Sequence, residues 1–254
     1  MNVENLDGFP VIKLLDHGHV RLVDNMGNDL SIVRNARVSY DADWRAGEDE
    51  KSDARLIQYL MSHKHNTPFE TVCFTFDVKA PIFVFRQWHR HRTQSYNELS
   101  ARYKPLPNET YIPDINTIGR QSKHNKQMRN IEHPYTESEY EDVEAYLEAM
   151  KLQNNSAHVL YKEMLELGIP RELARSVLPI STYSHMFTTV NLHNLFRFLS
   201  ERLMPEAQYE IRIYAQAIFK LIEPIVPVAT QAFAQSLPQQ VLSDLSYGLI
   251  EQGL

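Results

Sequence analysis

The densest group of chemically versatile side chains in this 254-residue sequence is the segment 86–92, which reads Arg-Gln-Trp-His-Arg-His-Arg. It holds three arginines and two histidines, and no acidic residue occurs between Asp77 and Glu98. Guanidinium groups bind phosphate oxygens through two parallel hydrogen bonds, a geometry that lysine cannot offer. Because the apolar residues 82–85 and Trp88 draw this segment against a core, where arginines need anionic partners, the sequence predicts a buried phosphate site.

The segment that follows adds the groups needed to recognise a nucleotide. Residues 95–103 contain amide, carboxylate and hydroxyl side chains and a fourth arginine, Arg102. A solvated basic helix face is the simpler explanation of an isolated Arg/His run. A nucleic-acid site is disfavoured by the short basic run and by the formal net charge of −6, which repels nucleic acid and anionic membranes.

Histidine pairs and a single cysteine offer other chemistry. His-x-His pairs start at positions 17, 63 and 89, but lysine or arginine within or beside them opposes a divalent cation, so we expect no metal site. Cys73 falls on the polar side of a predicted strand with no basic residue at its own position to lower the thiol pKa, so we expect no nucleophile there. The sequence has no GxGxxG, P-loop or GxSxG motif, which excludes a Rossmann-type turn around a nucleotide.

Hydrophobic periodicity predicts the elements that position these groups. Residues 71–79 alternate apolar and polar side chains, as in a half-buried strand, and residues 11–30 read as a hairpin or a pair of short strands. Residues 103–135 carry several prolines and polar side chains and are predicted to form a long surface loop. Helices are predicted over residues 52–63, capped by Ser52 or Asp53, from 81 onward, and over 136–167, 170–179, 192–203 and 205–222.

The order of these elements, with strands and helices first and mostly helices later, favours an α+β fold in a single domain over residues 1–254. No apolar stretch is long enough to cross a bilayer, and residues 1–10 do not resemble a leader peptide. With one cysteine the chain cannot form an internal disulfide. We therefore expect a cytoplasmic protein without a membrane partner.

Several segments together resemble a known family. Arg90-His91-Arg92, seven further residues and then Ser100 resemble the RHR-x7-S signature of the flavin-dependent thymidylate synthases. Segments 36–39, 65–70, 175–179 and 190–191 resemble other parts of the same family in consistent order, and the likeness covers residues 28–222. The resemblance implies an α+β fold with a large mixed sheet and several helices, assembled as a homotetramer whose active sites are shared between chains.

The resemblance also implies an activity. The family transfers the methylene group of 5,10-methylenetetrahydrofolate to C5 of dUMP, and FAD reduced by NADPH supplies the reducing hydride, so that tetrahydrofolate is released. The rival interpretation is a non-catalytic protein of the same fold that binds FAD or a nucleotide. Nucleic acid is not an expected partner under either interpretation.

Carried over position by position, the resemblance assigns two sets of binding residues. The dUMP contacts are Gln87, Arg90, Glu98, Ser100, Ala101, Arg102, Arg175 and Arg202. The FAD contacts are Ser39, His65, Thr67, Glu70, Arg90, His91, Arg92, Thr93, Asn97, Glu98, Asn191, His193 and Arg197. Ala101, His193 and Arg197 stand where the family commonly has Gly, Arg and Asn.

Two of these residues are the candidate catalytic groups. The resemblance places Arg202 on the uracil, where a guanidinium would stabilise the anion formed as N3 ionises. Ser100 is assigned to binding and orientation, because no sequence neighbour offers it a general base.

Overall fold

The centre of the molecule is a six-stranded sheet with the strand order β1-β2-β3-β4-β8-β5. The computed structural model describes residues 1–130 and 135–250, and side chains as far as 245. The strands are β1 Glu4–Leu6, β2 Phe9–Leu14, β3 Gly18–Met26, β4 Cys73–Pro81, β5 Ser95–Glu98 and β8 Tyr183–Asn191. A separate two-stranded ribbon pairs β6 Arg120–Gln121 with β7 Arg129–Asn130.

Helices make up most of the remaining described structure. They are α1 Asp29–Arg37, α2 Glu50–Ser62, α3 Ile82–Trp88, α4 Ile115–Ile118, α5 Glu137–Glu166, α6 Arg171–Ala174, α7 Leu192–Arg202, α8 Tyr209–Ile222, α9 Pro227–Ala234 and α10 Gln239–Ile250. Short 3-10 helices follow α1 at Val38–Tyr40, α2 at Thr67–Thr71 and α6 at Arg175–Val177. Within the described ranges, no helix is both long and apolar enough to span a membrane.

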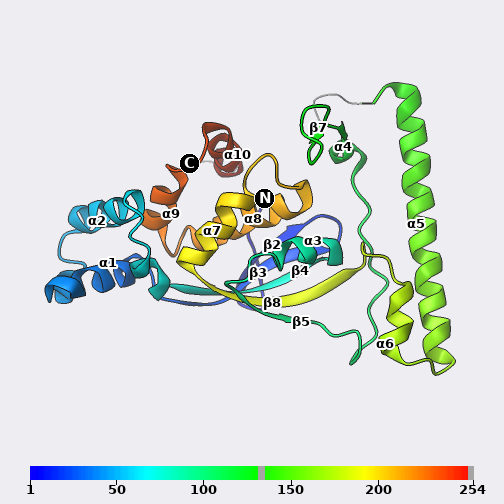
Figure 1. The fold of residues 1–254 in the computed structure, drawn as a ribbon, viewed down its shortest axis with the longest axis horizontal. Coiled ribbons are helices and arrows are strands. Elements are labelled where there is room, and N and C mark those ends of the chain that lie inside the picture. Colours follow the sequence, from blue (N-terminus) through cyan, green and yellow to red (C-terminus); the bar gives the residue numbers. More distant parts are fainter. Residues whose placement is uncertain (131–134, 251–254) are drawn as a thin grey trace.

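The helices cover one face of the sheet. In Figure 1, α7 and α8 lie over the sheet, and α9 and α10 lie beyond them on the same side. The opposite face carries no helix in the part of the chain that the structure describes. Helices α1 and α2 form one end of the molecule, whereas α6 and the long helix α5 form the other end.

Strand β4 shows why the sheet forms. Its side chains alternate as predicted, so that Phe74, Phe76 and Val78 are fully buried in the core beneath the helices. The intervening Thr75 and Lys79 point to the open face and are only partly buried. Because β4 pairs with β3 on one side and β8 on the other, this alternation sets the register of the three central strands.

The α+β class is confirmed, but the expected mixed sheet is antiparallel in every described pairing. Strands β1, β2 and β3 are joined by hairpins, and β4 and β8 run against their neighbours, so the sheet contains no parallel crossover. The capping box predicted at Thr136 and the long helix after it are confirmed.

The expected cap of the second helix is wrong. Helix α2 begins at Glu50 and is capped by Asp49, whose carboxylate accepts hydrogen bonds from the next turn. Asp53 is instead buried inside the helix and forms an ion pair with Arg37, with Nη2 and Oδ1 2.6 Å apart. A cap must lie where backbone N–H groups are free, and Asp53 already lies one turn inside the helix.

A buried carboxylate fastens the predicted surface loop to the core. Glu210, in the first turn of α8, is 2% exposed. Arg129 on β7 donates to both of its oxygens at 2.7 and 2.8 Å, and the Tyr111 hydroxyl donates to it at 3.1 Å. A buried charge is tolerated only when it is paired and hydrogen-bonded. Arg129 and Tyr111, both in segment 103–130, therefore supply the cation and the hydrogen-bond donor that allow Glu210 of α8 to be buried.

We predict that Arg129→Ala lowers the free energy of unfolding by about 3 kcal/mol, because Glu210 would remain buried without its cation. Urea unfolding followed by circular dichroism would measure the change. Arg120→Ala is the matched control, since Arg120 lies on the same ribbon and pairs with the half-exposed Glu139. We expect the control to change stability far less, and equal losses in the two variants would contradict this account.

Candidate active site

The basic segment 86–92 lies at the surface, which corrects the prediction of a buried phosphate site. The helical period of α3 turns Val84, Phe85 and Trp88 into the core. It thereby leaves Arg86 exposed, and the chain after the helix exposes Arg90, Arg92 and Thr93 as well. The three guanidinium groups form no ion pair with a carboxylate in the described ranges, so the segment is an exposed cationic surface above a packed helix.

His91 in this segment is partly buried and meets the end of α7. Arg202, the last residue of α7, donates from Nε to His91 Nε2 at 2.9 Å, and its Nη2 lies 3.4 Å from the Gln87 carbonyl oxygen. Burial, followed by the Arg202 guanidinium, holds the pKa of His91 below its usual value. A neutral imidazole can accept the Arg202 hydrogen bond, whereas an imidazolium cannot. The geometry therefore joins the candidate catalytic arginine to the RHR segment.

Gln87 connects the same region to the buried carboxylate of α8. Its amide nitrogen donates to Gln208 Oε1, and Gln208 Nε2 donates to Glu210 Oε2 at 2.8 Å. Gln208, Glu210 and Arg129 are not among the residues predicted from the sequence. One pattern in the sequence could have indicated this buried group. Glu210 occupies a position on the apolar side of its helix, one turn before the buried Tyr214.

The strand β5 and the residues after it carry a second group of predicted contacts. Glu98 accepts a hydrogen bond from the Ser184 hydroxyl at 2.7 Å, and Asn97 precedes it on the exposed edge strand. Ser100 Oγ accepts from the Arg102 backbone N–H at 3.3 Å. No histidine or carboxylate in the described part of the chain bonds to this hydroxyl. The arrangement suits binding rather than nucleophilic attack, and Ala101 beside it is buried.

Arg102 and Arg175 lie near α6, away from the His91–Arg202 pair. Arg102 Nε is 3.7 Å from a Glu172 carboxylate oxygen, and both side chains are more than half exposed. Arg175 begins the 3-10 helix after α6 and is exposed. An exposed ion pair of this length contributes little stability, so a phosphate group could displace Glu172 from Arg102 at small cost.

The remaining predicted FAD contacts occupy the opposite half of the sheet. Asn191 ends β8, pairs with Cys73 in the ladder and caps α7 by accepting from the Asn194 N–H at 2.9 Å. The 3-10 helix Thr67–Thr71 follows His65 and carries Thr67 and Glu70. The carbonyl of Val72, just after it, accepts a hydrogen bond of 2.8 Å from the N–H of Leu192, the first residue of α7. The segment with Thr67 and Glu70 is therefore beside Asn191.

Ser39, His193 and Arg197 complete the FAD set. His193 and Arg197 lie one turn apart on α7. Ser39 is on the 3-10 helix that follows α1, whereas Arg175 is on the 3-10 helix that follows α6. Helices α1 and α6 lie at opposite ends of the molecule in Figure 1. Hydrogen bonds thus join Gln87, His91 and Arg202 directly. The predicted dUMP and FAD residues as a whole, however, are distributed from one end of the molecule to the other.

The open face of the sheet contains a buried carboxylate surrounded by basic groups. Asp77 on β4 is 1% exposed and contacts His185 on β8, Arg21 Nη2 at 2.7 Å and His19 Nε2 at 3.4 Å. Burial would raise the Asp77 pKa, but the hydrogen bonds from His185 and His19 outweigh burial and hold that pKa well below its usual range. His19, Asp77 and His185 have the residue types of a metal site, but the Arg21 guanidinium occupies one side of the carboxylate.

Cys73, on the same face, shows no sign of activation. Burial raises the pKa of its thiol, and the sulfur lies 4.0 Å from the Glu70 carbonyl oxygen. A nucleophilic cysteine needs the opposite shift, which a nearby cation or a helix N-terminus would produce. This agrees with the expectation that Cys73 is a small strand residue.

The residues present fit the chemistry of a flavin dinucleotide. Its pyrophosphate needs cations, and the guanidinium groups of Arg90, Arg92 and Arg197 form no ion pair with any described carboxylate, although the protein as a whole carries a formal charge of −6. Its ring edges need hydrogen-bonding groups, which the side chains of Thr67 and Asn97 could offer from the surface.

Sequence comparison gives a family for this arrangement. A profile of the family described as "Thymidylate synthase complementing protein" matches residues 21–228. The flavin-dependent thymidylate synthase of Thermus thermophilus is 48% identical over 235 residues, which cover 91% of this chain and 81% of that protein. The flavin-dependent thymidylate synthase of Thermotoga neapolitana is 46% identical, with coverage of 87% and 93%.

A solved structure agrees with these relatives. The UMP/dUMP methylase PolB from Streptomyces cacaoi, bound with 5-Br dUMP, superposes with a TM-score of 0.76 at 34% identity, covering 88% of this chain and 97% of that one. Profile, sequence relatives and fold all point to one group of enzymes. The chain belongs to the thymidylate synthase complementing protein family, whose curated members named above are flavin-dependent thymidylate synthases.

Proposed function

We propose that this protein is a flavin-dependent thymidylate synthase that converts dUMP to dTMP. The observation that carries the proposal is the hydrogen bond from Arg202 to His91, which fixes a guanidinium beside Gln87 and Arg90 at the exposed cationic segment. The lowered pKa of His91 favours the neutral imidazole that accepts this bond. Held in this way, Arg202 stabilises negative charge on the uracil as N3 ionises, which raises the electron density at C5.

The other dUMP residues bind and orient the nucleotide. Arg102 and Arg175 are the proposed phosphate ligands, and Arg90 supplies a further cation. Glu98, fixed by the Ser184 hydroxyl, and Gln87, fixed by Gln208, are proposed to recognise polar edges of the nucleotide. Ser100 and Ala101 lie between these groups along the chain and are proposed to hold the substrate without forming a covalent bond to it.

FAD is the proposed cofactor, with NADPH and 5,10-methylenetetrahydrofolate as co-substrates. When bound, FAD supplies the redox chemistry that the side chains lack. The chain's own residues hold it: Arg92, Thr93, Asn97 and His91 at the cationic segment, and Ser39, His65, Thr67, Glu70, Asn191, His193 and Arg197 from the other half of the sheet. No described side chain is needed as a covalent catalyst, in keeping with the unactivated Cys73.

We further propose a homotetramer of single-domain chains with shared active sites. The dUMP residues near α6 and the FAD residues near α1 lie at opposite ends of one chain, and chains packed side by side would bring such ends together. The uncovered sheet face, with Phe187 40% exposed, is a surface available for packing. One connected cluster of buried hydrophobic residues from Ile12 to Val241 supports the single domain, and the lone cysteine supports a cytoplasmic location.

The first experiment is the visible absorption spectrum of the purified protein before and after addition of dUMP. We expect a flavin band that changes shape on addition of dUMP, because the proposed dUMP and FAD sites share Arg90 and Glu98. Turnover of dUMP to dTMP would then separate an active enzyme from the non-catalytic rival. A protein that does not bind excess FAD and does not respond to dUMP would refute the proposed function.

We predict that Arg202→Lys lowers kcat about 100-fold, the usual loss when one hydrogen-bond donor to a developing anion is removed. Lysine keeps the charge but cannot donate to His91 and the uracil in the same planar geometry. Arg86→Lys is the matched control, because Arg86 is an exposed arginine of the same segment outside the proposed site. Steady-state assays of dTMP formation measure both variants, and an unchanged kcat in Arg202→Lys would remove Arg202 from the mechanism.

We predict that Cys73→Ala retains turnover near that of the unmodified protein. The raised thiol pKa leaves little thiolate, so the sulfur cannot serve as the attacking group on the uracil. The dTMP assay together with a far-ultraviolet circular dichroism spectrum tests this expectation. Complete loss of turnover in a folded Cys73→Ala protein would count against the flavin-dependent mechanism as a whole.

A further inference from the structure

Gln208 links the buried Glu210 carboxylate to Gln87, a residue of the proposed dUMP site. Its Nε2 donates to Glu210 Oε2 at 2.8 Å, and its Oε1 accepts a hydrogen bond from Gln87 Nε2. Gln208 occupies the capping position of α8, which favours serine, threonine, aspartate or asparagine, and its side chain makes no capping bond. The two amide bonds, rather than helix capping, therefore account for a glutamine at this position.

Glu210 fixes the direction in which the Gln208 amide points. The carboxylate accepts hydrogen bonds from Arg129 at both oxygens and from the Tyr111 hydroxyl. Burial, followed by the nearby Glu210 charge, raises the pKa of Tyr111 well above its usual value, so the phenol keeps its proton and donates it. A carboxylate paired with an arginine has no proton to donate. Gln208 must therefore turn its NH2 group toward Glu210 and its carbonyl oxygen toward α3.

The direction passes on to Gln87. Because the Gln208 oxygen can only accept, the Gln87 amide must present its nitrogen to it, and that nitrogen carries a second N–H. The Gln87 side chain forms no other hydrogen bond with a residue that the structure describes. Its backbone carbonyl oxygen lies 3.4 Å from Nη2 of Arg202, the group proposed to act on the uracil. The second N–H of Gln87 is therefore a donor of fixed direction beside the proposed base site.

Resting on the proposed function, we propose that Gln208 is a positioning residue that makes Gln87 select uracil over cytosine. The two bases differ at position 4, where uracil carries a carbonyl oxygen that accepts and cytosine an amino group that donates. The second N–H of Gln87 donates to O4 of uracil. It meets the amino group of cytosine as donor against donor, and an unpaired polar group in a site rejects the wrong ligand. If the amide turned over, its oxygen would take the place of the nitrogen and accept the cytosine amino group.

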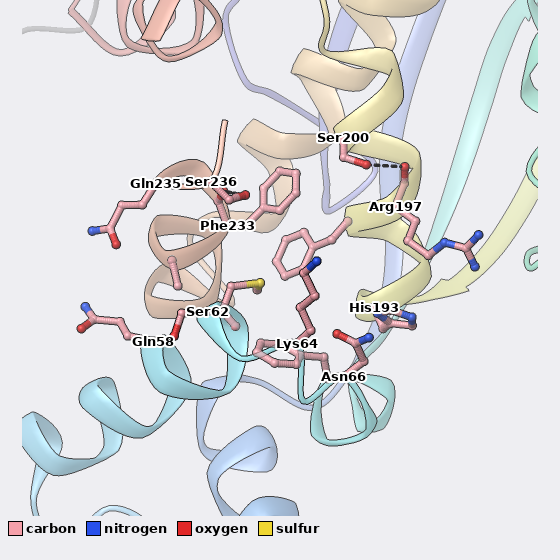
Figure 2. A pocket seen from close by; sticks show the side chains of 14 residues that line it. Gln58, Ser62, Lys64, Asn66, His193, Arg197, Ser200, Phe233, Gln235 and Ser236 are labelled. Atoms are coloured by element: carbon pink, nitrogen blue, oxygen red, sulfur yellow. Dashed lines mark hydrogen bonds between the residues drawn. The ribbon is translucent and has the colours of Figure 1, made fainter. Parts of the chain in front are cut away.

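The cofactor side of the protein does not depend on this chain of amides. The cavity in Figure 2, of about 570 Å³, belongs to the proposed FAD site, because His193 and Arg197 of α7 line it. Neither Gln87 nor Gln208 lines this cavity. We therefore expect variants at Gln208 to keep the flavin absorption band, so that a change in nucleotide binding can be measured on protein loaded with FAD.

The test is isothermal titration calorimetry of the FAD-loaded protein with dUMP and with dCMP. We expect the unmodified protein to prefer dUMP about tenfold, the contribution of one hydrogen bond. Gln208→Lys can still pair with Glu210 but presents a donor to Gln87, so the Gln87 amide turns over. We expect this variant to bind dUMP more weakly and dCMP more tightly. Both nucleotides carry the same phosphate, so the ratio of the two Kd values cancels the effect of the added charge.

Two further variants sharpen the test. Gln208→Leu removes both amide bonds and lets the Gln87 amide turn freely, so we expect the preference for dUMP to disappear. Gln216→Lys is the matched control, because it adds the same charge about two turns further along α8. The Gln216 side chain forms no hydrogen bond with any residue in the described ranges. We expect this control to keep the preference of the unmodified protein.

Other outcomes overturn the proposal. If Gln208→Lys and Gln208→Leu weaken both nucleotides by the same factor, Gln208 only packs α8 against α3. Equal binding of dUMP and dCMP by the unmodified protein would also remove the selection. The titration needs no turnover. An active protein whose preference does not depend on Gln208 refutes only this assignment, whereas an inactive protein with the expected ratios refutes only the proposed catalysis.

Discussion

The alternation of side chains along β4 is the constraint on which the rest of the molecule depends. Because this strand lies between β3 and β8, each side chain that it sends into the core fixes the register of both neighbours. Phe74, Phe76 and Val78 bring the helices onto one face, and the polar residues between them are left on the other. A sheet covered on one face only leaves the polar side chains of its other face uncovered. Of the proposed FAD and dUMP residues, Asn97, Glu98 and Asn191 lie on its strands, and the others lie on the helices and connecting segments around it.

Two buried carboxylates bind together segments that the hydrophobic core alone would leave loose. Asp77 draws arginine and histidine from β3 and a histidine from β8, so it links the three central strands on the uncovered face. Glu210 draws Arg129 and Tyr111 from the segment before α5, and it draws Gln208 from the position just before its own helix. Burial makes each unpaired charge costly, so the partners become obligatory and the fold more specific. Through Gln208, that requirement reaches Gln87 and the substrate side of the protein.

The elements that could be predicted from the sequence are those that a local pattern of residues determines. The alternation before Lys79 and the capping box at Thr136 each predict their element from neighbouring residues. Helix α1 was missed because Asn28 and Asp29, which begin it, also have the composition of a turn. The burial expected for Arg90 and Arg92 was wrong because the apolar residues before them bury one side of α3, which ends at Trp88, and the chain after the helix lies at the surface. The pair of Arg129 and Glu210 could not be predicted, since 81 residues separate them and no local pattern links them.

The central residue of the segment Arg90-His91-Arg92 must be a hydrogen-bond acceptor, for a physical reason. The ends of α3 and α7 both carry arginines, and two cationic surfaces approach each other only when a group between them accepts hydrogen bonds. Burial and the Arg202 guanidinium together hold the pKa of His91 low, so the imidazole offers Nε2 as that acceptor. Its ring also packs edge-on against Phe198 with centroids 4.9 Å apart, which orients the nitrogen toward Arg202. An amide could accept the bond but would lack this packing, and a protonated histidine would repel the arginine. His91 therefore has two roles. It accepts a hydrogen bond where the cationic ends of α3 and α7 meet, and it orients the Arg202 guanidinium that the proposed chemistry requires.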